Sequence, residues 1–134
     1  MITLELQTNA RQEMLRITRL IARTVQEAGW HNGVLTLFVP HTTAAVSINE
    51  NADPDVMTDL LYALERQVPT RDPNYRHGEG NSAAHVKATL VGLSQAVIVR
   101  DGNLALGTWQ DLLFCEFDGP RRRQLYLEFT PSTQ

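Results

Sequence analysis

Several features that would narrow the class of this 134-residue protein are scarce or missing in its sequence. A single cysteine, Cys115, cannot form an internal disulfide, which is typical of a reducing compartment. No apolar run approaches the ~20 residues of a transmembrane helix, and the first residues lack the pattern of a signal peptide. The net charge of −3 argues against a surface that binds nucleic acid. We therefore expect a cytoplasmic protein with no nucleic-acid partner and no membrane segment.

The length and the hydrophobic fraction of 43% predict one globular domain over residues 1–134. Hydrophobic periodicity predicts strands at residues 2–7 and, more weakly, 13–16. From residue 17 the period changes to that of a helix with one apolar face, and Gly29 occupies the position of a left-handed cap. Residues 33–39 and 43–48 are then predicted to be adjacent strands, joined through a turn that contains His41.

The second half of the chain continues this alternation of elements. Asp53 and Pro54 are typical of the first positions of a helix, which we expect to end near residue 67. A long polar loop over residues 70–80 leads to a short helix capped by Asn81 or Ser82. Closing strands follow at residues 95–100, 111–118 and 123–130. The order ββ-α-ββ-α-short α-βββ, with two main helices, predicts an α+β fold with a mainly antiparallel sheet or sandwich.

The polar groups most suited to chemistry are concentrated in residues 74–87. Two histidines, His77 and His85, flank Glu79, Asn81 and two glycines. A glycine-rich turn that leads into a helix offers unpaired N–H groups to an anion, and imidazoles can bind metal or transfer protons. The His77–His85 spacing matches no established zinc motif, so structural histidines with ordinary hydrogen bonds remain the alternative.

Candidate polar groups also occur elsewhere in the chain. His41 lies at a predicted strand end, whereas His31 looks incidental. Asn49 and Glu50 offer oxygen ligands suited to magnesium, although helix capping can explain acidic and amide residues there. Trp109 could form the wall of an aromatic-ring pocket or fill the core. Arg121 could hold a phosphate, or it could belong to a solvated charged turn together with Asp118.

Several ordered motifs between residues 37 and 123 resemble the YjbQ family, whose members are described as secondary thiamine-phosphate synthases. The matching strings are PHTTA at 40–44, NEN at 49–51, DP at 53–54, His77 with EGN at 79–81, and H-x-K-x-x-L at 85–90. The most specific are S-x-x-V-x-V-x-x-G at 94–102, GTWQ-x-L at 107–112 and EFDGPR at 116–121. The resemblance implies a sandwich of two small sheets, a homotrimer, and a polar site near the subunit boundary that often holds a metal or anion.

The activity ascribed to this family joins an aminopyrimidine methyl diphosphate to a thiazole phosphate and releases pyrophosphate. A hypothesis for this chain follows, in which a divalent metal (zinc or magnesium) neutralises the diphosphate. The alternatives are a metal-dependent hydrolase of a small phosphorylated metabolite and a non-catalytic trimer that binds metal or anion. The residues assigned to the site are, as catalytic groups, His41, Glu50, His77, Glu79, His85 and Trp109; as substrate-binding groups, Asn49, Asn81, Lys87, Gln110 and Arg121; and as metal ligands, His41, His77, His85 and Asp118.

Overall fold

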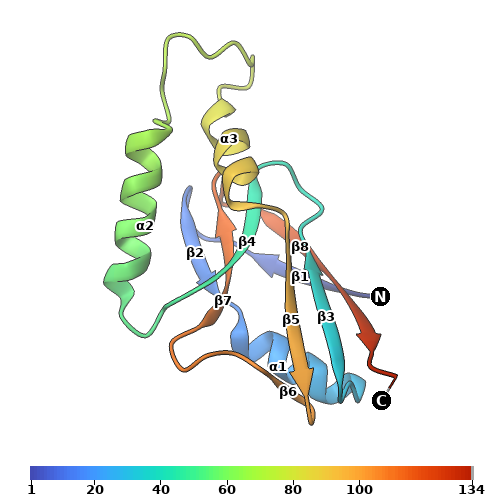
Figure 1. Ribbon diagram of the computed structural model, residues 1–134. Coiled ribbons are helices and arrows are strands. Elements are labelled where there is room, and N and C mark those ends of the chain that lie inside the picture. Colours follow the sequence, from blue (N-terminus) through green and yellow to red (C-terminus); the bar gives the residue numbers. More distant parts are fainter. Residues whose placement is uncertain (134) are drawn as a thin grey trace.

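The computed structural model describes residues 1–133, which form two antiparallel sheets that pack against each other and three helices (Figure 1). The five-stranded sheet has the order β1-β8-β3-β5-β6 and the three-stranded sheet the order β2-β7-β4. The strands are β1 (Ile2–Gln7), β2 (Glu13–Arg16), β3 (Gly33–Phe38), β4 (Ala44–Asn49), β5 (Ser94–Arg100), β6 (Asn103–Leu104), β7 (Asp111–Glu116) and β8 (Arg122–Pro131). The helices are α1 (Thr18–Ala28), α2 (Pro54–Gln67) and α3 (Ser82–Val91).

The main core lies between the two sheets. Because side chains alternate along a strand, β3, β5 and β8 each direct one set of aliphatic side chains inward, where they meet β4 and β7. Helix α1 closes one end of this core with Ile21 and Val25, both fully buried. The buried residues from the sheets are Leu35, Leu37, Val39, Ala44, Val46, Val97, Val99, Leu112, Phe114, Leu125 and Leu127.

Helices α2 and α3 cover the outer face of the three-stranded sheet. Ala84 and Ala88 of α3 pack with Leu113 and Cys115 of β7 in a second apolar cluster, and α2 adds partly buried side chains such as Leu61. Burial raises the pKa of the Cys115 thiol to about 12, so this cysteine is an inert core residue. The loop between α2 and α3 leaves this layer and returns to the N-terminus of α3 at the top of the molecule (Figure 1).

The opposite face of the five-stranded sheet is uncovered in the single chain. Val34, Phe38 and Ile98 project from it and are 41%, 43% and 56% exposed. Phe38 stacks on Tyr126 of the neighbouring strand, with ring centroids 6.4 Å apart. A monomeric protein rarely leaves such a group of apolar side chains together in water. Among the described residues, none of the helices has the length and apolar character needed to cross a bilayer.

The predicted α+β fold with two antiparallel sheets is confirmed, and most element boundaries agree within one or two residues. Asp53 caps α2 by accepting a hydrogen bond from the Asp55 N–H, with Pro54 at the first helical position. Gly29 ends α1 in the left-handed conformation at φ 70°. Only the two-residue strand β6 was not predicted, since so short a segment carries no periodicity.

Candidate functional site

A cavity of about 470 Å³ opens at the end of the three-stranded sheet where β4 begins and β7 ends. Three regions that are distant in sequence contribute to its wall: the β3–β4 loop, the end of the α2–α3 loop with the first turn of α3, and the β7–β8 turn with the start of β8. The polar side chains on this wall are His41, Thr42, Thr43, His77, Glu79, Asn81, His85, Asp118, Arg121 and Arg123. The fold therefore brings together the three histidines that the sequence singled out.

His77 and His85 lie against each other in this wall. Their ring centroids are 5.3 Å apart and the ring planes meet at 86°, an edge-to-face arrangement. His77 is exposed on the loop, whereas His85 is half-buried in the first turns of α3. The Gly80 N–H donates to the His77 carbonyl, which turns the loop back toward the helix. Glu79 lies on the same turn, exposed and part of the cavity wall.

His41 contributes to the cavity in a different chemical form. Its Nε2 accepts a hydrogen bond from the Gln124 backbone N–H at 2.8 Å, so this nitrogen carries no proton. Burial lowers the pKa of His41 below the ordinary histidine value, and the neighbouring Arg123 guanidinium lowers it further. The ring is therefore neutral near pH 7, with its proton on Nδ1. His41 is equipped to donate a hydrogen bond, and the Nε2 lone pair that a metal would need is already in use.

Beneath the cavity lies a buried ion pair between Glu116 at the end of β7 and Arg123 in β8. Arg123 donates through Nε to Glu116 Oε1 at 2.9 Å and through Nη2 to the Thr43 hydroxyl at 2.9 Å. The Thr8 hydroxyl donates to Glu116 Oε1 at 2.7 Å. Although burial opposes ionisation, these hydrogen bonds and the Asp118 N–H hold the pKa of Glu116 below its usual range. This network ties four segments together beneath the cavity.

On the rim, Asp118 connects the β7–β8 turn to α3. Its Oδ2 accepts hydrogen bonds from Arg121 Nη2 and Asn81 Nδ2, both at 2.8 Å. Arg121 also donates through Nε to the Asp118 carbonyl at 2.7 Å, and its Nη1 takes no part in these contacts. The Asn81 Oδ1 is buried and meets no hydrogen-bond donor within the described chain. A group that donates a hydrogen bond, or a cation, would satisfy that oxygen.

Lys87 was predicted to bind substrate, and the structure corrects this assignment. Lys87 is only 1% exposed and its Nζ donates to Glu65 Oε1 at 2.8 Å and to Gln12 Oε1 at 3.0 Å. Lys87 follows His85 by two residues on α3, and its side chain is directed toward α2 rather than toward the cavity. The same Glu65 carboxylate accepts hydrogen bonds from the Thr70 N–H and hydroxyl. Lys87 therefore anchors the start of the α2–α3 loop.

Four further predicted site residues lie at the other end of the three-stranded sheet. In the β4–β7 register, Ala44 pairs with Glu116 beside the cavity, whereas Asn49 pairs with Asp111. Five residue steps along a strand separate these pairs by about 17 Å. Glu50, Trp109 and Gln110 adjoin this distal end, and Trp109 is 65% exposed. Within one chain, Asn49, Glu50, Trp109 and Gln110 do not reach the histidines.

The donor set at the cavity fits a divalent metal only in part. His77 and His85 offer two neighbouring imidazoles, and the Asn81 Oδ1 is an unpaired oxygen in the same wall. The predicted ligand His41 has its Nε2 engaged, and the predicted ligand Asp118 already accepts from Arg121 and Asn81. Across residues 1–133, no three His, Cys, Asp or Glu side chains are grouped as metal ligands would be.

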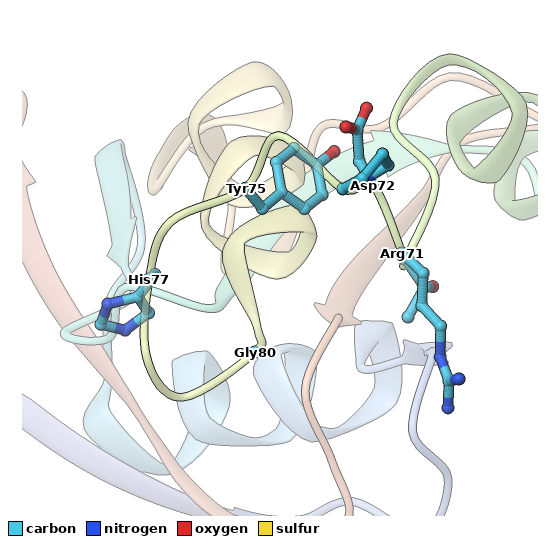
Figure 2. A pocket seen from close by; sticks show the side chains of 7 residues that line it. Arg71, Asp72, Tyr75, His77 and Gly80 are labelled. Carbon is cyan, nitrogen blue, oxygen red and sulfur yellow. The ribbon is translucent and has the colours of Figure 1, made fainter.

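Two parts of the site were not predicted from the sequence. Thr43 and Arg123 line the cavity and are joined by a hydrogen bond from the Arg123 guanidinium to the Thr43 hydroxyl. The sequence feature that could have identified Arg123 is a charged residue at an inward position of a β-strand. A second cavity, of about 340 Å³, lies in the α2–α3 loop and shares His77 with the first (Figure 2). Tyr75 belongs to this lining, so an aromatic side chain that shares a cavity with His77 is Tyr75, whereas Trp109 lies at the distal end of the sheet.

Fold and cavity together define a two-sheet α+β protein with a histidine-lined site at one end of its smaller sheet. The family model for the UPF0047 protein YjbQ-like family matches residues 2–132. The chain is 50% identical over 126 residues to the UPF0047 protein YugU of Bacillus subtilis, covering 94% of this chain and 96% of that protein. It is 47% identical over 124 residues to a UPF0047 protein of Methanocaldococcus jannaschii, covering 92% and 89%.

Solved structures show the same architecture. A YjbQ/UPF0047 family protein of Clostridium acetobutylicum superposes with a TM-score of 0.93 at 45% identity, over 97% of this chain and 100% of that one. A conserved hypothetical protein of Thermus thermophilus gives a TM-score of 0.91 at 38% identity, with the same coverage. The chain belongs to the YjbQ-like UPF0047 family.

Proposed function

We propose that this protein is an enzyme that binds a small phosphorylated substrate in the histidine-lined cavity. In the reaction that we favour, an aminopyrimidine methyl diphosphate and a thiazole phosphate combine with release of pyrophosphate. One observation carries the proposal: His41, His77 and His85 come from separate segments and meet Arg121 in one cavity of about 470 Å³. Binding sites of this size with convergent polar groups are typical of small-molecule enzymes.

Phosphate recognition would use donors from three elements. Arg121 has Nη1 outside its contacts with Asp118, and guanidinium groups bind phosphate oxygens well. The neutral His41 adds its Nδ1–H. The first N–H groups of α3 have no intrahelical acceptor, and the Asn81 side chain does not cap them. These donors would hold a diphosphate across the mouth of the cavity.

The bond changes then require little covalent participation by the protein. The methylene C–O bond to the diphosphate breaks, its electron pair leaves with pyrophosphate, and the thiazole nitrogen forms a new bond to the methylene carbon. Arg121 and His41 would stabilise the negative charge that grows on the leaving group. His85, His77 or Glu79 would accept or return a substrate proton, since each lines the cavity.

A divalent metal, zinc or magnesium, belongs to this proposal as an additional group. If bound, it would supply positive charge to the diphosphate leaving group. His77 and His85 are the residues that would hold it, with Asn81 Oδ1 as an unpaired oxygen in the same wall. The roles given above to Arg121 and to the α3 N-terminus do not depend on it.

We further propose that the protein is a cytoplasmic homotrimer with the site near a subunit boundary. The uncovered apolar face of the five-stranded sheet supports assembly, because Val34, Phe38 and Ile98 would leave water in an interface. Assembly would also account for the polar residues at the distal end of the three-stranded sheet. Within one chain Glu50 and Trp109 lie far from the histidines, so only another copy could bring such groups to the cavity.

The experiment measures pyrophosphate and phosphate release from the aminopyrimidine methyl diphosphate, with and without the thiazole phosphate. We expect pyrophosphate only when both substrates are present. The His77→Ala and His85→Ala variants should each lose about 100-fold or more in rate, with the metal lost and the assembly unchanged. His31→Ala is the matched control, because His31 is exposed and lies away from the cavity wall. Full activity in both His77→Ala and His85→Ala would refute the assignment.

The same experiment decides between this reaction and two other functions. Phosphate release that does not need the thiazole partner would instead support a metal-dependent hydrolase, with water as the nucleophile in the same cavity. Tight binding of phosphate compounds without any turnover would support a non-catalytic trimer that binds metal or anion. The several titratable groups around this cavity favour an enzyme over simple binding, which needs fewer of them.

A further inference from the structure

The second cavity lies next to the first and shares a wall with it. Its volume is about 340 Å³, and its lining belongs entirely to the loop between α2 and α3 (Figure 2). His77 is the residue common to both linings, so the two cavities adjoin at this residue. The two volumes together exceed what a phosphate or diphosphate group alone would fill.

The chemistry of the second lining differs from that of the first. Tyr75 and Pro73 provide flat apolar surface, and the Gly80 backbone adds no side chain that would obstruct it. Asp72 contributes a carboxylate acceptor to this lining, and its Oδ1 is fixed by the Asn74 N–H at 2.8 Å. Arg71 extends away from the Tyr75 ring in Figure 2, so it does not cover the aromatic surface. A flat aromatic group that carries N–H donors matches this lining.

The loop that forms this cavity is held in place before any ligand arrives. The Tyr75 N–H donates to the Asp72 carbonyl at 3.1 Å, which closes a turn around Pro73. At the start of the loop, Thr70 donates from its N–H and its hydroxyl to Glu65, the partner of the buried Lys87. A wall ordered in this way loses little conformational entropy when it binds.

We propose that the second cavity is a subsite for the heterocyclic ring of the substrate. A planar heterocycle with an amino or ring N–H group stacks on Tyr75 and donates to Asp72, while its phosphate or diphosphate lies beyond His77 in the first cavity. This inference rests on the proposed function, because it assigns the non-phosphate part of the same substrate. It makes Tyr75 and Asp72 specificity residues for the ring.

The test compares the binding of two probes to the 134-residue chain by titration calorimetry, without turnover. The affinity for inorganic pyrophosphate measures binding to the first cavity alone, and the affinity for the aminopyrimidine methyl diphosphate measures binding to both cavities. Tyr75→Ala should weaken the affinity for the aminopyrimidine methyl diphosphate about tenfold, because one aromatic stacking surface is lost. It should change the affinity for pyrophosphate by less than about twofold. Tyr75→Phe should retain the affinity for both. Tyr62→Ala is the matched control, because Tyr62 is an exposed tyrosine on α2 outside this lining.

A second variant probes the ring donor without relying on the aromatic surface. Asp72→Asn keeps an oxygen for the Asn74 N–H but removes the negative charge, so it should weaken only the ring-bearing probe, by severalfold. The subsite is refuted if Tyr75→Ala leaves the ring-bearing probe unaffected, or if it weakens both probes equally, which would indicate collapse of the loop. Either result leaves the proposed function standing. If the unchanged protein binds neither probe, the proposed function itself fails and the subsite with it.

Discussion

The Gln124 backbone N–H donates to Nε2 of His41 over 2.8 Å and thereby decides which nitrogen of this ring holds the proton. Because the donor is a backbone N–H, a change of the Gln124 side chain does not remove this hydrogen bond. The bond depends instead on the register of β8. With the pKa of His41 lowered by burial and by Arg123, the ring stays neutral and presents Nδ1–H. The role that follows is hydrogen-bond donation to a ligand oxygen.

Two substitutions of His41 separate the functions of its two nitrogens. His41→Asn places an amide N–H near the Nδ1 position but loses the contact with Gln124, whereas His41→Gln keeps an acceptor near Nε2 and loses the donor. We expect His41→Asn to retain more activity and to lose about 1 kcal/mol of stability, as for one hydrogen bond. His41→Gln should show the reverse. Steady-state rates and thermal unfolding measure both, and equal activities would contradict the donor role.

The protonation state of His41 can also be observed directly. Nitrogen chemical shifts of the imidazole, followed by NMR from about pH 8 to about pH 5, should report a neutral ring with the proton on Nδ1 until the pH is below the ordinary histidine value of about 6.5. The unfolded chain takes up this proton at higher pH than the folded one. His41 therefore costs stability as the pH falls through that value. An imidazolium signal at pH 7 would contradict this assignment.

The buried pair of Glu116 and Arg123 should be the most sensitive polar contact in the fold. Glu116→Gln would leave a buried guanidinium without its counter-charge, and we expect a loss of about 3–5 kcal/mol in the free energy of unfolding. Chemical denaturation measures this loss. Glu27→Gln, an exposed glutamate on α1, is the matched control and should change stability by less than about 0.5 kcal/mol.

The same pair makes the stability of the fold depend on pH. Since the pKa of Glu116 is lowered on folding, the unfolded chain binds more protons than the folded chain once the pH is near the ordinary glutamate value of about 4.3. The stability that Glu116 contributes is fully present above that value and is lost as the pH falls further. Arg123→Met should flatten this acid dependence, and an unchanged dependence would count against it.

Glu65 and Lys87 make a similar prediction for the α2–α3 loop. Burial opposes ionisation of Glu65, but hydrogen bonds from Lys87, Thr70 and Gln12 outweigh it and lower the pKa of Glu65 to about 2. Lys87→Met should therefore raise that pKa toward the ordinary value, which carboxyl NMR shifts would follow. It should also speed amide hydrogen exchange at Thr70, whose N–H donates to this carboxylate. An unchanged exchange rate at Thr70 would show that Lys87 does not stabilise the start of this loop.

The sequence predicted the elements well because hydrophobic period and helix caps are local signals. Asp53 with Pro54, and Gly29, placed helix ends that the structure confirms. It also selected His41, His77 and His85, which the fold brings to one cavity. The place of a residue within a motif, however, does not reveal in which direction its side chain points. Lys87 follows His85 by two residues, which on a helix turns its side chain away from the same face.

Long-range pairing was the part that local patterns could not supply. Asn49 and Trp109 belong to motifs as specific as those around His41. The strand register nevertheless puts Asn49 about 17 Å from the cavity end of β4, with Trp109 at the same distal end of the sheet. Arg123 has the same parity as Leu125 and Leu127, so it falls at an inward position of β8, where a charge requires a buried partner.

The uncovered face of the five-stranded sheet gives the last prediction, which concerns assembly. Ile98 is 56% exposed and lies beside Val34 in the β3–β5 register, within the apolar group. A lysine there would remain solvated in a single chain but would be buried without a partner in an interface, at a high cost. Ile98→Lys should therefore convert an assembly of three times the 15.1 kDa chain mass into monomers.

Light scattering coupled to size exclusion measures that mass, and circular dichroism checks that the separated chains remain folded. Gln26→Lys on the exposed side of α1 is the matched control, since it adds the same charge away from the sheet face. If the distal residues complete the cavity of a neighbouring copy, the monomeric variant should lose catalytic activity while its pyrophosphate affinity, which depends on Arg121 and His41 of one chain, stays within about twofold. A wild-type chain that is already monomeric, with full activity, would refute both the trimer and the shared site.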